Sequence, residues 1–314
     1  MRLVMMGTGP FAVPTFRGLI HARHEIAALV TRPPKDSGGR PLPPNPMRQA
    51  AEEHSLPVCD PANVNTPPAQ ASLARYEADL LVVCDYGQIL SAETLATARF
   101  GGINLHASLL PKYRGAAPIN WAIYHGETET GVSVIHMTPR IDAGPVIAQA
   151  RTPIEPNETA VELERRLAEI GAWLIRRAID NIESGRLEAL PQDPTLASRA
   201  PRLKKTDGAV DWSRPAEAIR NQVRALEPWP KTYTFWHREG APPMRLILGP
   251  VEVAEAPASP PGTVLEAGDN RILIATGRGG AVLREIQPAG KRRLSVDEFL
   301  RGYRVRPGDR FGPE

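Results

Sequence analysis

Apolar runs and amphipathic stretches alternate through the first half of the chain. Runs that predict β-strands lie at residues 2–6, 25–30, 78–87, 101–108 and 131–138. Patterns that predict helices lie near residues 67–76, 91–97, 117–125 and 159–184. Strands that alternate with helices predict an α/β domain built on an open, parallel, Rossmann-like sheet with helices on both faces.

The pattern changes after Gly185. Residues 186–210 have weak periodicity and three prolines, which favours a linker, and Ser213 is placed to cap a helix near 214–226 with Pro215 in its first turn. Short strands separated by turn residues follow near 231–237, 244–254, 262–266, 271–275 and 281–287. Closely spaced short strands predict a small β-barrel. Ser295 and Glu298 have the spacing of a capping box for a brief closing helix.

Length and composition agree with two globular domains. The chain has 314 residues, and domains usually have about 100–200. We expect a catalytic domain over residues 1–189, a linker over 190–205 and a β-barrel domain over 206–314. The hydrophobic fraction of 42% and the charged fraction of 23% exclude a disordered or fibrous chain.

Cysteine content and charge narrow the class further. The two cysteines, Cys59 and Cys84, exclude a disulfide framework and a four-thiolate zinc site, and they favour a reducing cytoplasm. No apolar run approaches the roughly 18 residues of a membrane span, so we expect no membrane partner. The net charge of +3 permits a polyanionic partner without establishing one.

A glycine-rich turn follows the first predicted strand. Residues 7–12 formally match the dinucleotide-binding pattern G-x-G-x-x-A. However, Thr31 and Arg32 follow the second predicted strand, where a nucleotide-binding domain would place an acidic residue for the ribose. The sequence therefore favours a tight strand-to-helix turn over a nicotinamide site.

Three polar residues form a candidate catalytic group. Asn104 and His106 are two positions apart, so a strand presents both side chains on one face. They fall at the carboxyl end of that strand, where open α/β sheets build their sites, and Asp142 lies on a loop beyond the next strand. An amide, an imidazole and a carboxylate are the groups needed to move an acyl group onto an amine. A single histidine is often structural, and Asn and Asp often form turns, so spacing alone leaves the role open.

Several motifs resemble the folate-dependent formyltransferases, and among them those that act on methionyl-tRNA. The most specific is residues 108–115, SLLPKYRG, with Asn104-Leu105-His106 before it. The resemblance covers essentially the whole chain and includes residues 7–14, 83–90, 142–144, 210–216, 228–230, 300–303 and 308–309. It implies transfer of a formyl group from 10-formyltetrahydrofolate to the amino group of methionyl initiator tRNA, without a metal and by a monomer.

The resemblance also implies roles for individual residues. Asn104, His106 and Asp142 correspond to the catalytic trio. Folate would be bound by Ser108, Leu109, Leu110 and Pro111 and by the backbone of Tyr86, Gly87, Gln88, Ile89 and Leu90. The methionyl-tRNA would meet Phe11, Arg32, Lys35, Arg40, Lys204 and Lys205, and the C-terminal barrel, similar to an oligonucleotide-binding fold, would support it.

Two features depart from the family pattern. The proline-rich segment 31–48, predicted to be a loop, carries fewer basic residues than usual, and Pro145 follows the Asp142-Ala143-Gly144 turn. Three alternatives stay open: a formyltransferase for a small amine, a non-catalytic nucleic-acid-binding protein and a nicotinamide oxidoreductase. A small-amine enzyme has little need for a second domain, so the C-terminal half disfavours that alternative.

Overall fold

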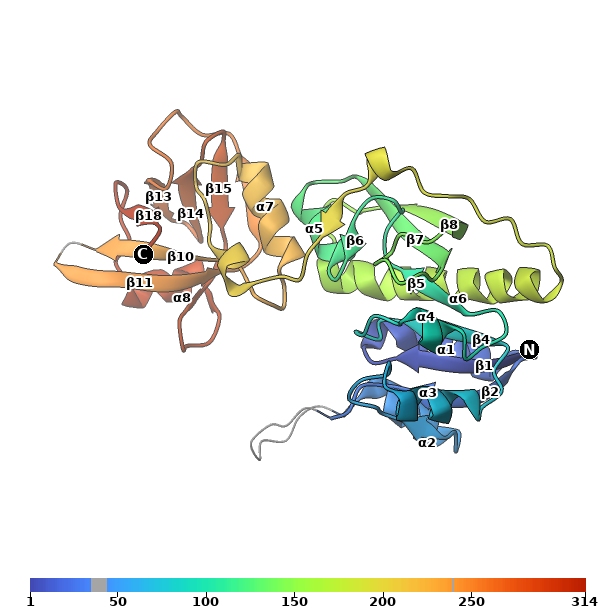
Figure 1. The fold of residues 1–314 in the computed structure, drawn as a ribbon. Coiled ribbons are helices and arrows are strands. Elements are labelled where there is room, and N and C mark those ends of the chain that lie inside the picture. Colours follow the sequence, from blue (N-terminus) through green and yellow to red (C-terminus); the bar gives the residue numbers. More distant parts are fainter. Residues whose placement is uncertain (35–43, 239) are drawn as a thin grey trace. The chain divides into compact units, whose positions relative to one another are not determined.

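The computed structural model describes residues 1–34, 44–238 and 240–314. Contacts group them into two units, and Figure 1 shows their elements. The first unit comprises 1–118, 129–153 and 162–201, and the second comprises 119–128, 154–161 and 202–314. Segments 119–128 and 154–161, which we expected inside the catalytic domain, thus group with the C-terminal part. The domain boundaries at 189 and 206 stay a prediction.

A seven-stranded sheet forms the centre of the first unit. Its strands, in spatial order, are β3 (Val58–Cys59), β2 (Glu25–Val30), β1 (Arg2–Gly7), β4 (Leu80–Cys84), β5 (Gly102–His106), β7 (Glu129–His136) and β8 (Val146–Pro153). The strands from β3 to β5 pair in parallel, which confirms the Rossmann-like fold. The sheet is not parallel throughout, because β7 runs antiparallel to both β5 and β8.

Helices connect these strands (Figure 1). The helical elements are η1 (Pro10–Ala12), α1 (Val13–Ile20), α2 (Pro46–Glu53), α3 (Pro67–Ala74), α4 (Ala92–Leu95), α5 (Pro118–Tyr124), α6 (Ala160–Glu183) and η2 (Pro194–Leu196). Two very short strands, β6 (Arg114–Gly115) and β9 (Arg199–Ala200), pair in parallel outside the main sheet.

Helix α2 corrects the prediction that residues 31–48 form a loop throughout. The side chain of Asn45 caps the helix by accepting hydrogen bonds from the backbone N–H groups of Met47 and Arg48, at 2.9 and 3.2 Å. Pro46 occupies the first helical turn, where its missing N–H costs nothing. Lys35 and Arg40 lie outside the described residues.

The two faces of the sheet bury different side chains. Val4, Met6, Leu81 and Val83 contribute to a core cluster on one face, together with residues of α3 and α4. Leu105 of β5 contacts α6, where Gly171 leaves no side chain in the way: a Cβ there would lie 2.5 Å from Leu105. Because neighbouring strand residues alternate, Asn104 and His106 point away from α6.

The second unit consists mainly of two antiparallel sheets. One sheet has the order β17 (Leu294–Ser295), β16 (Glu285–Pro288), β11 (Ala241–Leu248), β10 (Tyr233–Arg238) and β18 (Arg310–Gly312). The other has the order β12 (Val251–Ala254), β15 (Gly280–Leu283), β14 (Arg271–Ala275) and β13 (Val264–Gly268). Hydrogen bonds from Val264 N–H to Asp309 and from Phe311 N–H to Gly262, at 2.8 and 2.7 Å, join the two sheets as a barrel requires.

Elements outside these sheets complete the second unit. They are η3 (Lys205–Gly208), α7 (Ala216–Ala225) and α8 (Val296–Gly302), together with the part of α5 that lies within 119–128. The capping box of α8 is confirmed, because Ser295 and Glu298 exchange side-chain-to-backbone hydrogen bonds of 3.0 and 3.2 Å. The predicted cap of α7 is wrong: Pro215 occupies the N-cap position, and Ser213 instead bonds Asp211.

Segments from the first half of the chain pack within the second unit. The side chain of Asn120 donates a 2.7 Å hydrogen bond to the carbonyl of Ala225 at the end of α7. Arg224 of the same helix donates to the carbonyls of Glu155 and Glu158, at 3.3 and 3.0 Å. The second unit is therefore discontinuous in sequence.

Candidate active site

Strand β5 presents two polar side chains at its carboxyl end. Asn104 pairs in register with Val83 of β4 on one side and with Ile135 of β7 on the other. His106 pairs with Ser133 of β7, and only 6% of its surface is exposed. The strand therefore holds an amide and an imidazole side by side, two residues apart on the same face.

Asp142 lies beside both of these side chains. Its Oδ1 accepts a hydrogen bond from Nδ2 of Asn104 at 3.5 Å, and its Oδ2 lies 3.7 Å from Nδ1 of His106. The backbone N–H of Gly115 also donates to Oδ2, at 2.9 Å. The structure thus brings together the three residues that the sequence predicts to be catalytic, although Pro145 follows their loop.

Backbone contacts orient the imidazole of His106. Its Nε2 lies 2.9 Å from the carbonyl oxygen of Tyr113, which can only accept a hydrogen bond. Nε2 therefore carries a hydrogen, and Nδ1 is the atom that faces Asp142. Tyr113 has a φ of 62°, an unusual value for a residue with a side chain, which indicates that its backbone is held in this conformation by its surroundings.

A hydrogen-bonded loop follows β5 and contains the predicted folate residues Ser108 to Pro111. The Ser108 hydroxyl is fully buried and donates to the carbonyl of Lys112 at 2.7 Å. Ser133 of β7 donates to the carbonyl of Ser108 and accepts from the N–H of Leu110, at 2.6 and 3.0 Å. These bonds hold the loop in one conformation beside His106.

The second predicted folate segment, Tyr86 to Leu90, follows β4, the neighbour of β5. Gln88 ties it down by accepting from the N–H of Val64 at 3.0 Å and donating to the carbonyl of Pro61 at 3.2 Å. The side chains of Tyr86 and Leu90 are buried, whereas that of Ile89 is 56% exposed. Of these three side chains, only that of Ile89 is accessible to solvent.

Asp85 precedes this segment, and its carboxyl group has an unusual pKa. Loss of solvation, with a smaller contribution from the Glu164 carboxyl, raises the pKa of Asp85 to about 6. Its carboxylate lies so close to Gly9 that a Cβ there would be 1.7 Å from Oδ2. The glycine-rich turn thus makes room for this carboxyl group.

Replacing Asp85 by asparagine should raise the melting temperature at pH 8 by no more than about 4 °C, less than the full pKa shift implies, because Asp85 is exposed and solvent screens its charge. Because the folded-state pKa of Asp85 lies above its unfolded value, wild-type stability falls as pH rises through the interval from about 4 to 6. The gain should therefore disappear near pH 4, as calorimetry at both pH values can show.

Asp211→Asn is the matched control for this measurement. Hydrogen bonds from Ser213 lower the pKa of Asp211, so its replacement should bring no gain at pH 8. An equal gain for Asp85→Asn at pH 4 and pH 8 would show that ionisation is not the cause.

The residues predicted to meet the methionyl-tRNA lie on several elements. Phe11 is buried in η1, and Arg32 is exposed and donates to the carbonyl of Gly87 at 2.9 Å. Lys204 and Lys205 are exposed at the start of η3 in the second unit. Phe11 and Arg32 thus belong to the first unit, and Lys204 and Lys205 belong to the second.

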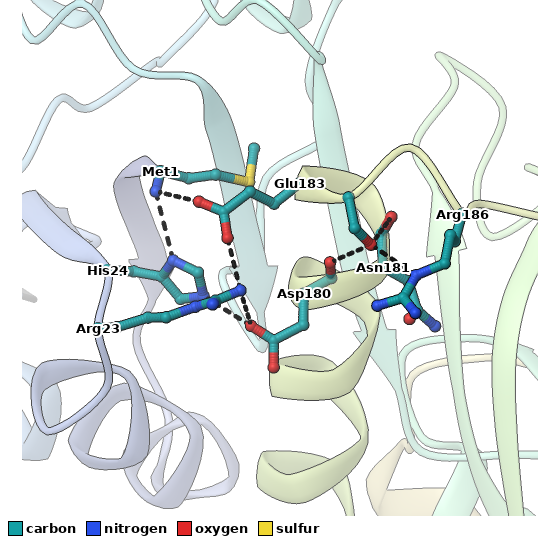
Figure 2. A network of polar contacts seen from close by, with 8 residues as sticks. Met1, Arg23, His24, Asp180, Asn181, Glu183 and Arg186 are labelled. Carbon is teal, nitrogen blue, oxygen red and sulfur yellow. Dashed lines mark hydrogen bonds and ion pairs between the residues drawn. The ribbon is translucent and has the colours of Figure 1, made fainter.

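His24, Asp180 and Glu183 form a polar cluster elsewhere in the first unit (Figure 2). Their potential metal-ligand atoms lie within 4.8 Å of one another. However, Arg23 lies 3.0 Å from Asp180 and 2.6 Å from Glu183, and the Met1 ammonium lies 2.9 Å from Glu183. Both carboxylates thus already face positive charge, and a divalent cation would have to displace Arg23.

Sequence reasoning missed the residues that hold the candidate catalytic loop. Gln192 donates to the carbonyls of Asp142 and Gly144, at 2.8 and 2.7 Å, but lies in the predicted linker. The backbone of Tyr113 and Gly115 falls inside the recognised motif, yet its contacts depend on folding. No periodicity in residues 186–210 could have indicated Gln192.

Comparison with known proteins identifies the family. The formyl transferase family model matches residues 1–179, and that of the formyl transferase C-terminal domain matches residues 202–304. The chain is therefore a member of the formyl transferase family, as the fold and the residues at the end of β5 indicate. Its 40–46% identity to curated methionyl-tRNA formyltransferases places it with that group of enzymes.

Curated relatives carry this assignment over nearly the full length. The methionyl-tRNA formyltransferase of Rhodopirellula baltica is 46% identical, and the alignment covers 99% of this chain and 96% of the relative. Those of Geobacter sulfurreducens and Moorella thermoacetica are 42% and 40% identical, each over 99% of this chain, with 97% and 99% of the relatives covered.

Solved structures show that the fold is shared more widely. A sugar 3N-formyl transferase, WlaRD, has a TM-score of 0.66 and 19% identity, covering 93% of this chain and 99% of that one. A glycinamide ribonucleotide transformylase from Symbiobacterium toebii has a TM-score of 0.52 and 21% identity, covering 62% of this chain and 94% of its own.

Among the described residues, no helix has the length and apolarity to cross a membrane.

Proposed function

We propose that this protein transfers the formyl group of 10-formyltetrahydrofolate to the amino group of methionyl initiator tRNA, for translation initiation. The observation that carries the proposal is the 40–46% identity to methionyl-tRNA formyltransferases over 99% of the chain. The cluster of Asn104, His106 and Asp142 supplies the chemistry that this reaction needs. We further propose that the enzyme works as a monomer in the cytoplasm.

We propose distinct roles for the three side chains. The methionyl amine attacks the formyl carbon and forms a C–N bond, the bond from that carbon to N10 of the folate breaks, and a proton passes from the amine to N10. The amide of Asn104 donates a hydrogen bond to the oxyanion that develops on the formyl oxygen. His106 and Asp142, which face each other at 3.7 Å, supply and accept the proton or stabilise the developing charge.

We propose that the folate binds to two loops of the first unit and that residues of both units contact the methionyl-tRNA. The loops at Tyr86–Leu90 and Ser108–Pro111 follow the neighbouring strands β4 and β5, which supports their role in binding folate. Phe11 is proposed to contact the methionyl group. Arg32, Lys35, Arg40, Lys204 and Lys205 are proposed to contact tRNA phosphates, supported by the barrel.

A small amine is the second candidate acceptor. We expected the C-terminal half to disfavour a small amine. However, the structure of the sugar 3N-formyl transferase matches 93% of this chain, including most of its C-terminal half. A second domain therefore does not distinguish the two acceptors, and the assignment depends on the relatives.

A formyl-transfer assay distinguishes these acceptors. With 10-formyltetrahydrofolate, methionyl initiator tRNA should be formylated with a kcat/KM at least about tenfold higher than methionyl elongator tRNA, since tenfold needs only about 1.4 kcal/mol of transition-state discrimination. Free methionine and an amino-sugar nucleotide serve as the small-amine arms. A higher kcat/KM with either small amine would contradict the proposal.

A further inference from the structure

The side chain of Gln192 spans the base of the loop that carries Asp142. Both hydrogens of its amide are used, because Nε2 donates to the carbonyl oxygens of Asp142 and Gly144, at 2.8 and 2.7 Å. One side chain thus fixes the backbone on both sides of Ala143.

The amide oxygen of Gln192 is held in turn by Arg114. Its Oε1 accepts from Nε and Nη2 of Arg114, at 3.1 and 2.7 Å, in a two-pronged contact. Arg114 directly precedes Gly115, whose N–H donates to Oδ2 of Asp142. The contacts form a closed ring that binds the Asp142 loop through both its backbone and its carboxylate.

The pairing of β6 with β9 places this ring. The N–H of Arg114 donates to the carbonyl of Ser198 at 2.9 Å, and Gly115 lies in register with Ala200. A Cβ on Gly115 would lie 2.5 Å from the carbonyl oxygen of Ala200, so this close approach requires glycine. The same strand thereby fixes the donor to Asp142 and the partner of Gln192.

The loop needs such an anchor because Asp142 has a strained backbone. Its φ of 48° is a left-handed value that residues with a side chain seldom adopt. Without the bonds from Gln192, relaxation toward an ordinary φ would rotate the carboxylate. The Asp142 carboxylate would then move away from Nδ1 of His106 and Nδ2 of Asn104, which lie 3.7 and 3.5 Å from its oxygens.

We propose that Gln192 is a positioning residue for formyl transfer, which holds the Asp142 carboxylate against His106 and Asn104. The inference rests on the proposed function of this site. Only an amide of this length matches the contacts: glutamate lacks the two donors, methionine lacks the donors and has only a weakly accepting sulfur, and asparagine is one methylene shorter.

The test compares Gln192→Glu and Gln192→Met with the wild type. Each substitution should lower kcat by about 10- to 100-fold, because a displacement of about 1 Å at a reacting group has an effect of this size. The KM values for 10-formyltetrahydrofolate and for the acceptor should change less than about threefold. A similar decrease in kcat for both variants would show that the negative charge of glutamate is not the cause. A decrease in kcat of less than threefold for both variants would overturn the proposal.

Gln222→Glu provides a matched control in the second unit. Nε2 of Gln222 donates to the carbonyls of Asp207 and Ala209, at 2.8 and 2.9 Å, and its Oε1 accepts from Arg214 at 3.4 Å. The same kinds of contact are thus lost in the other unit. Below the melting temperature this variant should keep its kcat, and an equal loss of kcat in both variants would indicate a general structural effect instead.

A double-mutant cycle and a crystal structure complete the test. In an Asp142→Ala background, Gln192→Met should have no further effect on kcat, and full additivity would overturn the proposal. The structure of Gln192→Met should show the Asp142 carboxylate turned away from His106, and an unmoved carboxylate would overturn it as well. This readout needs no turnover. Failure of the wild type to formylate methionyl-tRNA would therefore refute the proposed function without deciding the role of Gln192.

Discussion

Replacement of His106 by alanine should lower the kcat of formyl transfer by about 10²–10⁴-fold, the usual contribution of a positioned acid–base group. The imidazole is buried, its Nε2 is held by the Tyr113 carbonyl, and its Nδ1 faces Asp142. Alanine removes the group that handles the proton or the developing charge. Single-turnover measurements with saturating methionyl initiator tRNA would separate this loss from substrate binding.

His21→Ala is a suitable control for this variant. His21 ends helix α1 and contacts the ring of His54, with ring centres 5.5 Å apart. Its loss should leave kcat unchanged. If His106→Ala retains more than about a third of the wild-type turnover, the catalytic assignment is wrong.

Replacement of Asn104 by alanine should lower kcat by about 10²–10³-fold, as found when one oxyanion donor is removed from an enzyme. The Nδ2 group of Asn104 is near the end of β5 and donates a hydrogen bond to Oδ1 of Asp142 at 3.5 Å. Because the oxyanion exists only in the transition state, the KM for folate should change little. Steady-state kinetics with both substrates varied would measure the two parameters.

Asn120→Ala controls for the loss of a half-buried asparagine amide. Its Nδ2 donates to the carbonyl of Ala225 in the second unit. This variant should lower the melting temperature and leave kcat in place. A loss in Asn104→Ala that appeared only in KM would instead assign Asn104 to substrate binding.

In the seven-stranded sheet, the strands that the sequence predicts are those buried on both faces. β1, β2 and β4 are continuous apolar runs in the centre of the sheet, so their composition alone identifies them. β8 at the sheet edge was not predicted, because its residues are half-buried or exposed and include Gln149 and Arg151. Its pairing with β7, rather than apolar content, makes it a strand.

Predictions of single strands over 244–254 and 281–287 each combined two strands. β11 and β12 are separated at Gly249 and Pro250, and β15 and β16 are separated at Arg284. Each pair divides between the two sheets of the second unit, so the break turns the chain from one sheet to the other. Apolar residues lie on both sides of each break, so the hydrophobic pattern alone does not show where one strand ends and the next begins.

Local spacing also explains what could be predicted of the candidate site. Asn104 and His106 share a strand, so their common face follows from the two-residue period. The anchoring of Asp142 depends on Arg114 and Gln192, which are 78 residues apart in the chain. Contacts over such separations arise from the fold and have no local pattern.

The discontinuity of the second unit limits how members of this family can be recombined. Consider a chimera in which a recipient enzyme supplies residues 1–201 and this chain, as the donor, supplies the C-terminal part. It would combine the donor's α7 with the recipient's segments 119–128 and 154–161. The bonds of Arg224 to the carbonyls of Glu155 and Glu158 tolerate sequence change, because they involve backbone oxygens. The bond from the Asn120 side chain to the carbonyl of Ala225 is kept only if the recipient also has asparagine at position 120, so exchange of the second unit requires these two short segments to be transferred together with the barrel.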